Sequence, residues 1–153
     1  MLTRITIILF LLLTLACSEK KRTPSDITIG IIPKPADVVS MEGIFEITND
    51  VRLYVGSNNK DVLRIAKMFQ HKLQQASGIE IPVEEAKEGV KMENGILLTL
   101  QHADEALGNE GYSLEVKPSG VVVSATAAAG IFYGLQTLMQ LLPAEIESNQ
   151  KVD

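Results

Sequence analysis

The sequence predicts an α+β fold: a mostly antiparallel sheet with two helices packed on one of its faces. Two observations carry this prediction. Short runs that alternate between apolar and polar residues indicate strands with one buried face, and two longer stretches repeat their apolar residues with the helical period. With 153 residues, 46% of them hydrophobic, the chain is long enough for one domain with a real core.

Six runs predict strands. Residues 96–100 and 121–125 are apolar on both sides, which favours central strands, and Pro82 places its run at a sheet edge because proline cannot donate to a ladder. Residues 117–120 carry Pro and Gly where a type I turn prefers them, which predicts a hairpin. The apolar positions of the four alternating runs are Phe45 and Ile47; Val51, Leu53 and Val55; Ile79, Ile81 and Val83; and Tyr112, Leu114 and Val116.

The first helical stretch lies between residues that are typical of helix ends. Asn58 or Asn59 can cap its start, and Gly78 can end it. Its apolar residues cover roughly one third of the circumference, which predicts a surface helix lying on the sheet. The apolar side holds Val62, Ile65, Ala66, Phe69, Leu73 and Ala76, and the polar side holds Arg64, Lys67, His71 and Gln74.

The second helical stretch, about residues 127–142, has an apolar arc of roughly half the circumference, which is more than one sheet face needs. Thr126 is its predicted N-cap, and Pro143 ends it. We therefore expect this helix to have a second partner. The main stripe is Ile131, Leu135, Leu138 and Leu142; Phe132 and Met139 widen it on one side, and Leu141, Gly130 and Gly134 on the other.

The spacing of Gly130 and Gly134 allows another backbone to approach the second helix closely. The same Gly-x-x-x-Gly spacing occurs in membrane helix pairs. This stretch is too short to span a bilayer and carries two glutamines, so the sequence disfavours a membrane role for it.

The first 17 residues resemble a bacterial lipoprotein signal peptide. Arg4 precedes an apolar run over residues 5–15, and Ala16 precedes Cys17, the only cysteine of the chain. We expect Cys17 to be lipidated, which places the protein at the cell envelope, on the outer membrane or the periplasmic face. Residues 18–29 then form a polar tether. The alternative is an ordinary signal peptide with an incidental cysteine.

Four stretches of the folded part carry a resemblance to a known family. They are Ile31-Ile32-Pro33-Lys34-Pro35 with Gly43 and Phe45; Ser77-Gly78 with Ile81-Pro82-Val83; Glu110-Gly111-Tyr112-Ser113-Leu114; and residues 129–138, AGIFYGLQTL, with Gln140-Leu141-Leu142-Pro143. In this order and spacing they resemble the N-terminal, non-catalytic domain of the β-N-acetylhexosaminidases of glycoside hydrolase family 20. The resemblance covers residues 30–143. Hyaluronidase-like enzymes carry similar domains but match these stretches less well.

The resemblance implies a parent enzyme that removes terminal N-acetylhexosamine from glycans by substrate-assisted hydrolysis. In that family the catalytic Asp and Glu belong to a (β/α)8 barrel of about 250 residues. Only residues 144–153 follow the domain here, and we interpret them as the start of a linker to that barrel. The barrel is thus the expected partner, and we expect it to dock on Phe132, Met139 and Leu141. The glycan would bind to the barrel and not to this domain.

Within the chain itself we expect no catalytic residue, no metal and no cofactor. Asp104 and Glu105 could be taken for the catalytic Asp-Glu pair of the family. Gln101-His102-Ala103 precedes them where the family has His-x-Gly-Gly, so we predict a solvated loop instead. His102 with Asp104 is weak evidence for a metal. The net charge of −5 and the lack of a basic stripe with interleaved aromatics argue against nucleic acid. The alternative function is a free-standing lipoprotein that binds glycan or protein without catalysis.

Overall fold

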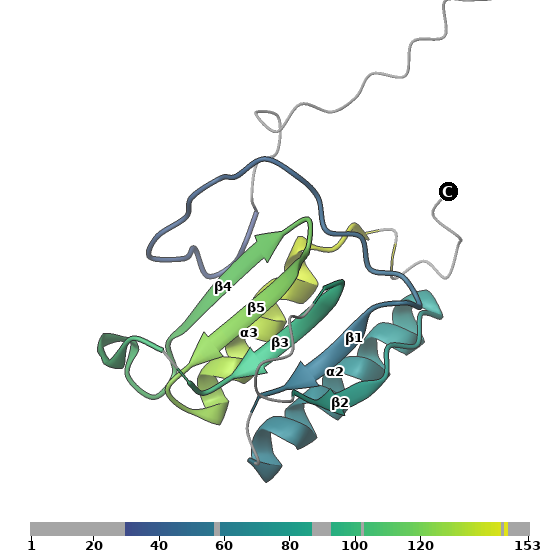
Figure 1. Cartoon of the computed structure of the whole chain (residues 1–153). Helices are drawn as coiled ribbons and strands as arrows, with labels where there is room; N and C mark the ends of the chain where they lie inside the picture. The colour runs from purple at the N-terminus through teal and green to yellow at the C-terminus, as the bar shows by residue number, and fades with distance from the viewer. Residues whose placement is uncertain (1–29, 57–58, 87–92, 102, 145, 147–153) are drawn as a thin grey trace, which may run out of the picture.

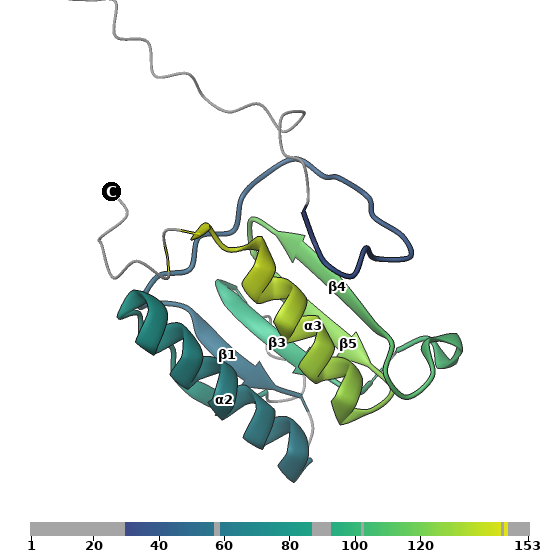
Figure 2. The ribbon, with the colours of Figure 1, turned by 180° about the vertical axis from the view of Figure 1, so that it is seen from behind.

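The computed structural model describes residues 30–56, 59–86, 93–101, 103–144 and 146. Over these residues the chain folds into a five-stranded sheet in the order β2-β1-β3-β5-β4. The two α-helices of the described residues cover the same face of this sheet, and neither of them lies on the other face (Figures 1 and 2). The elements are β1 (Arg52–Val55), α2 (Lys60–Ser77), β2 (Val83–Glu85), β3 (Gly95–Thr99), the 3-10 turn η3 (Glu105–Leu107), β4 (Tyr112–Lys117), β5 (Gly120–Ala125) and α3 (Ala128–Leu141).

The sheet is mixed, so the prediction of a mostly antiparallel sheet is wrong. β1 pairs in parallel with both β2 and β3, and β3 pairs in parallel with β5. Among the described strands, β4 and β5 form the one antiparallel pair, joined as predicted by the turn through Pro118 and Ser119. Alternation of apolar residues reveals which face of a strand is buried, but it carries no information about strand direction.

The core lies between the sheet and the helical layer. β3 and β5 are interior strands, as predicted, and Ile96, Leu98, Val121 and Val123 are fully buried or nearly so. The edge position expected for the run through Pro82 is also confirmed, because β2 begins just after it and flanks the sheet. That run is shorter than predicted: its ladder begins only at Val83.

The run containing Phe45 and Ile47 is not a strand, which corrects another prediction. Its side chains nevertheless alternate, since Phe45 and Ile47 pack against the core while Glu46 and Thr48 are exposed. This segment crosses the ends of the strands rather than running beside one (Figure 1). It can bury alternate residues there without forming a ladder.

The ends of α2 follow from local chemistry. The Oδ1 atom of Asn59 accepts hydrogen bonds from the backbone N–H of Asp61 (2.9 Å) and of Val62 (3.2 Å), so Asn59 is the cap. Gly78 ends the helix in the left-handed conformation with φ of 73°, and its N–H donates to the Gln74 carbonyl. The predicted apolar side is buried at Val62, Ile65, Ala66, Phe69 and Leu73.

The N-terminus of α3 differs from the prediction. Its N-cap is Ala127, and no side chain caps the helix there. The Thr126 hydroxyl instead donates to the carbonyl oxygen of Gly108, in the loop that follows η3. The hydroxyl of a threonine at a helix start can accept a hydrogen bond from the helix backbone or donate one to a nearby carbonyl. Here it donates to the carbonyl of the neighbouring loop.

Candidate docking surface on the helical layer

Gly130 and Gly134 form one flank of α3, the glycine flank, which packs closely against β4, β5 and the residue before β4. A Cβ atom at Gly130 would clash with the Gly111 carbonyl oxygen and lie 2.7 Å from the Ala125 Cβ. A Cβ atom at Gly134 would clash with Val123 and lie 3.2 Å from the Tyr112 ring. The close approach predicted for the glycines is therefore real, and the approaching backbone is that of Gly111, just before β4.

A partly buried hydrogen bond fixes the same flank. The hydroxyl groups of Thr137 and Tyr112 are hydrogen bonded to each other, and Thr137 is only 7% exposed. The sequence pattern placed Tyr112 on the inner side of its strand but gave no sign of its partner, because Thr137 looks like an ordinary polar helix residue. This bond ties α3 to β4 and sets which way the remaining flank of the helix points.

The opposite flank carries Phe132 and Met139. These two residues lie about 20° apart around a helix of 3.6 residues per turn, and both are half-buried against the core. Because the glycine flank lies over β4 and β5, this flank is the one turned toward α2, which contacts α3. Phe132 also meets the ring of Tyr133 edge-on, at a centroid distance of 5.6 Å.

Leu141 does not lie with them. It is 40% exposed and sits roughly 160–180° around the helix from Phe132 and Met139. The structure thus brings together two of the three residues predicted for docking. Whether any of the three docks on a barrel stays a prediction.

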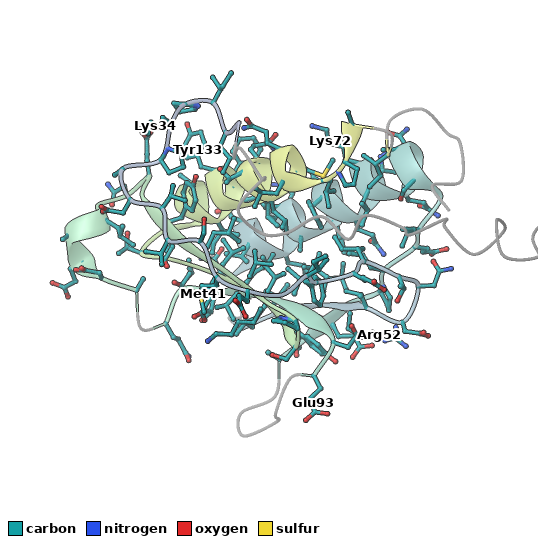
Figure 3. The ribbon with its side chains drawn as sticks, turned by 90° about the horizontal axis from the view of Figure 1, so that it is seen from above. Lys34, Met41, Arg52, Lys72, Glu93 and Tyr133 are labelled. Carbon is teal, nitrogen blue, oxygen red and sulfur yellow. The ribbon has the colours of Figure 1, made fainter. Side chains whose placement is uncertain are left out.

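Part of the outer side of α3 is covered by the N-terminal segment of the domain. The Ile32 N–H donates to the Gln140 Oε1 atom at 2.9 Å, and the Gln140 Nε2 atom donates to the Ile32 carbonyl at 3.0 Å. Figure 3 shows Lys34 of this segment on the helical side of the molecule, with Tyr133. The contact is made by a polar residue outside the apolar arc of α3, so the second partner expected from that arc stays a prediction.

The outer side of α2 is open. A shallow groove there is lined by Lys60, Leu63, Arg64, Lys67, Met68 and His71. Leu63 is 38% exposed and Met68 is 50% exposed, while His71 is exposed as predicted. The helical layer therefore presents a half-covered apolar flank on α3 beside an open polar surface on α2.

The suspected chemical sites are not assembled in the described residues. Asp104 caps η3, since its Oδ1 atom accepts from the Ala106 N–H at 2.9 Å, and Glu105 begins that turn; both are exposed. Among the residues that the structure describes, no group of three or more His, Cys, Asp or Glu side chains is placed to hold a metal ion. Cys17 and His102 lie outside the described residues.

The same part of the chain contains no helix long and apolar enough to cross a membrane. This finding includes α3, the stretch with the Gly-x-x-x-Gly spacing.

The described residues thus form an α+β domain with a helical layer on one side of a mixed sheet. The chain belongs to the family described as glycosyl hydrolase family 20, domain 2, which it matches over residues 28–152.

Similar proteins are hexosaminidases several times longer. A β-hexosaminidase of Porphyromonas gingivalis strain W83 is 34% identical over 146 residues, which cover 93% of this chain and 18% of that protein. The structure of Streptomyces plicatus N-acetyl-β-hexosaminidase is 35% identical with a TM-score of 0.65, covering 76% of this chain and 22% of the other. The family 20 enzyme of Streptomyces coelicolor A3(2) is 34% identical with a TM-score of 0.64, covering 74% and 21%. The chain thus spans about a fifth of these relatives.

Proposed function

We propose that the chain is the non-catalytic first domain of a β-N-acetylhexosaminidase that removes terminal N-acetylhexosamine from glycans by substrate-assisted hydrolysis. One observation carries the proposal: the match extends over 93% of this chain but only 18% of the Porphyromonas gingivalis β-hexosaminidase. The rest of such a protein has ample length for a catalytic barrel of about 250 residues. In this proposal the catalytic Asp–Glu pair belongs to that barrel, and the glycan is bound there.

The role of the domain is then to support the barrel through its helical layer. Phe132 and Met139 are half-buried apolar side chains that a neighbouring domain would finish covering, and Leu141 is an exposed one on the far flank. Interfaces between domains of one chain commonly combine such apolar contacts with polar ones. Barrel docking at these residues would therefore stabilise both parts.

We also propose that the parent enzyme is exported and held at the cell envelope by lipids on Cys17. The support is the sequence: a basic residue, an apolar run and a small residue directly before the single cysteine. More than one acyl chain is needed for stable anchoring, and a lipidated cysteine of the bacterial type carries several. Residues 18–29 would then separate the domain from the membrane.

The proposal is tested with two proteins. The first is the purified chain, which should not hydrolyse a chromogenic N-acetylglucosaminide. The second is a chimera in which residues 28–152 replace the matching region of the Porphyromonas gingivalis β-hexosaminidase; it should remain folded and active.

Two results would contradict the proposal. One is turnover by the chain alone that disappears in an Asp104→Ala, Glu105→Ala double variant, which would make that loop an active site. The other is a chimera that cannot fold while the unaltered relative, prepared in parallel, folds normally.

A further inference from the structure

A line of basic residues runs along the outer side of α2. Lys60, Arg64, Lys67 and His71 follow one another at intervals of four, three and four residues, which keeps them within about 60° of the helix circumference. We call these four residues the basic stripe. It points away from the sheet, since the buried residues of α2 lie on the opposite side of the helix. Exposed Leu63 and Met68 flank it.

The charges of the stripe are not balanced within the described part of the chain. There Lys60 and Lys67 have no ion-pair partner, and Arg64 meets Asp61 at 3.6 Å with both side chains 69% exposed. Such exposed pairs contribute little. The stripe thus concentrates positive charge on a chain whose net charge is −5.

The other face of the sheet is arranged differently. Arg52 pairs with Glu84 at 3.4 Å, and Lys117 pairs with Glu115 at 2.7 Å. Figure 3 shows Arg52 on this side of the molecule, opposite Lys72 and Tyr133 on the helical side. Arg52 and Lys117 therefore have ion-pair partners in the domain, whereas Lys60 and Lys67 have none among the residues that the structure describes.

The stripe lies beside the apolar flank already described. α2 and α3 contact each other and cover the same face of the sheet (Figure 2), and Phe132 and Met139 belong to the flank of α3 turned toward α2. A partner domain that covered Phe132 and Met139 would also extend over α2. Its surface would meet positive charge there, flanked by two exposed apolar side chains.

We propose that the basic stripe of α2 and the Phe132–Met139 flank of α3 form one docking surface, and that its occupant is an acidic face of the catalytic part of the same enzyme. This inference rests on the proposed function and adds the chemistry of the partner. A folded protein surface can reach half-buried residues between two helices, whereas a flat anionic membrane would engage the outermost charges. The position of Phe132 and Met139 therefore favours a protein partner.

The test uses the chimera described above and compares two charge reversals. Lys67→Glu alters the stripe, and Lys117→Glu makes the same change on the sheet face. Each variant is also made in the isolated chain, so that effects on the domain itself can be subtracted. After the shift of the isolated chain is subtracted, Lys67→Glu should lower the unfolding temperature of the chimera at low salt. Lys117→Glu, which also breaks the ion pair with Glu115, should leave no residual shift.

Salt should reduce the difference between the two reversals, because the screening length falls from about 10 Å at 0.1 M to about 3 Å at 1 M. In the isolated chain, Lys67→Glu should not lower the unfolding temperature, because the new carboxylate would lie one helical turn from Arg64 and His71. Adding Lys60→Glu should enlarge the effect in the chimera.

Each alternative result has a definite meaning. Met139→Lys is also made in the isolated chain, because Met139 packs against the core of the domain. If Met139→Lys destabilises the chimera more than the isolated chain and Lys67→Glu does not, the basic stripe is not part of the interface, although the domain docks. If neither change matters, docking through the helical layer fails altogether. A third result would show that the stripe belongs to a membrane contact and that the proposal is wrong. In that result the isolated chain binds phosphatidylglycerol vesicles, Lys67→Glu abolishes the binding, and the same change leaves the stability of the chimera unaffected.

Discussion

Replacement of Gly130 by alanine tests how α3 is seated. In a solvent-exposed helix, Gly→Ala stabilises by about 1 kcal/mol, because glycine has the greater freedom to lose on folding. Here the new methyl group would clash with the Gly111 carbonyl oxygen and lie 2.7 Å from the Ala125 Cβ. Real Cβ atoms essentially never come within 3.0 Å of a heavy atom outside their own residue and its chain neighbours. The structure therefore predicts that packing outweighs propensity.

The magnitude follows from what would have to move. The Gly111 N–H donates to the Leu107 carbonyl at 3.1 Å, and Ala125 lies in β5, so neither obstacle is the end of a flexible side chain. Overpacking a rigid site typically costs about 1–3 kcal/mol. After the helix gain is subtracted from the upper part of that range, Gly130→Ala should destabilise the domain by about 1–2 kcal/mol.

Urea unfolding followed by circular dichroism measures this difference. The calibrating variant is Ala129→Gly, at the exposed neighbouring position in the same first turn, which should cost at most about 0.5–1 kcal/mol through propensity alone. If Gly130→Ala stabilises the domain by about the propensity difference, then α3 does not rest on Gly111 and the seating described above is wrong.

Two further predictions concern the surface and the anchor. The isolated chain should self-associate or bind a hydrophobic dye through its incompletely covered apolar flank. Met139→Lys should reduce the self-association, as measured by sedimentation at matched concentration. A monodisperse wild-type chain that binds no dye would mean that the flank is already covered. In cells, labelled palmitate should enter the protein and Cys17→Ser should abolish the labelling, whereas equal labelling of both forms would exclude lipidation at that residue.

The sequence predicted what depends on neighbours along the chain. The burial of Val62, Phe69 and Leu73 follows from the helical period, and the cap at Asn59 and the end at Gly78 follow from local hydrogen bonding and backbone freedom. The hairpin through Pro118 followed in the same way from its turn residues.

Strand direction was missed because it depends on the connections. The alternating pattern of β1 is the same whichever way its neighbours run. A signal was present, however: α2 stands between β1 and β2, and a helix that connects two neighbouring strands of one sheet is the usual parallel crossover. Weighing connection lengths beside periodicity would have favoured the mixed sheet.

The candidate site was predicted only in part, for a different reason. The wide apolar arc of α3 indicated an excess of apolar surface, but a helical wheel does not say which flank is covered. That is decided by contacts distant in sequence: the bond between Thr137 and Tyr112, and the pairing of Gln140 with Ile32, which are 108 positions apart. Neither contact has a local signature.

These distant contacts also narrow where a partner can bind. Gly130 and Gly134 would be the natural place for another helix to approach, but Gly111, Val123 and Tyr112 already fill that space. The end of α3 near Gln140 is held by the N-terminal segment. Of the flanks of α3, the one carrying Phe132 and Met139 is turned toward α2, where Lys60 and Lys67 lack ion-pair partners among the described residues. A docking partner is therefore expected to cover both helices from that side, and its own surface should combine apolar and acidic residues.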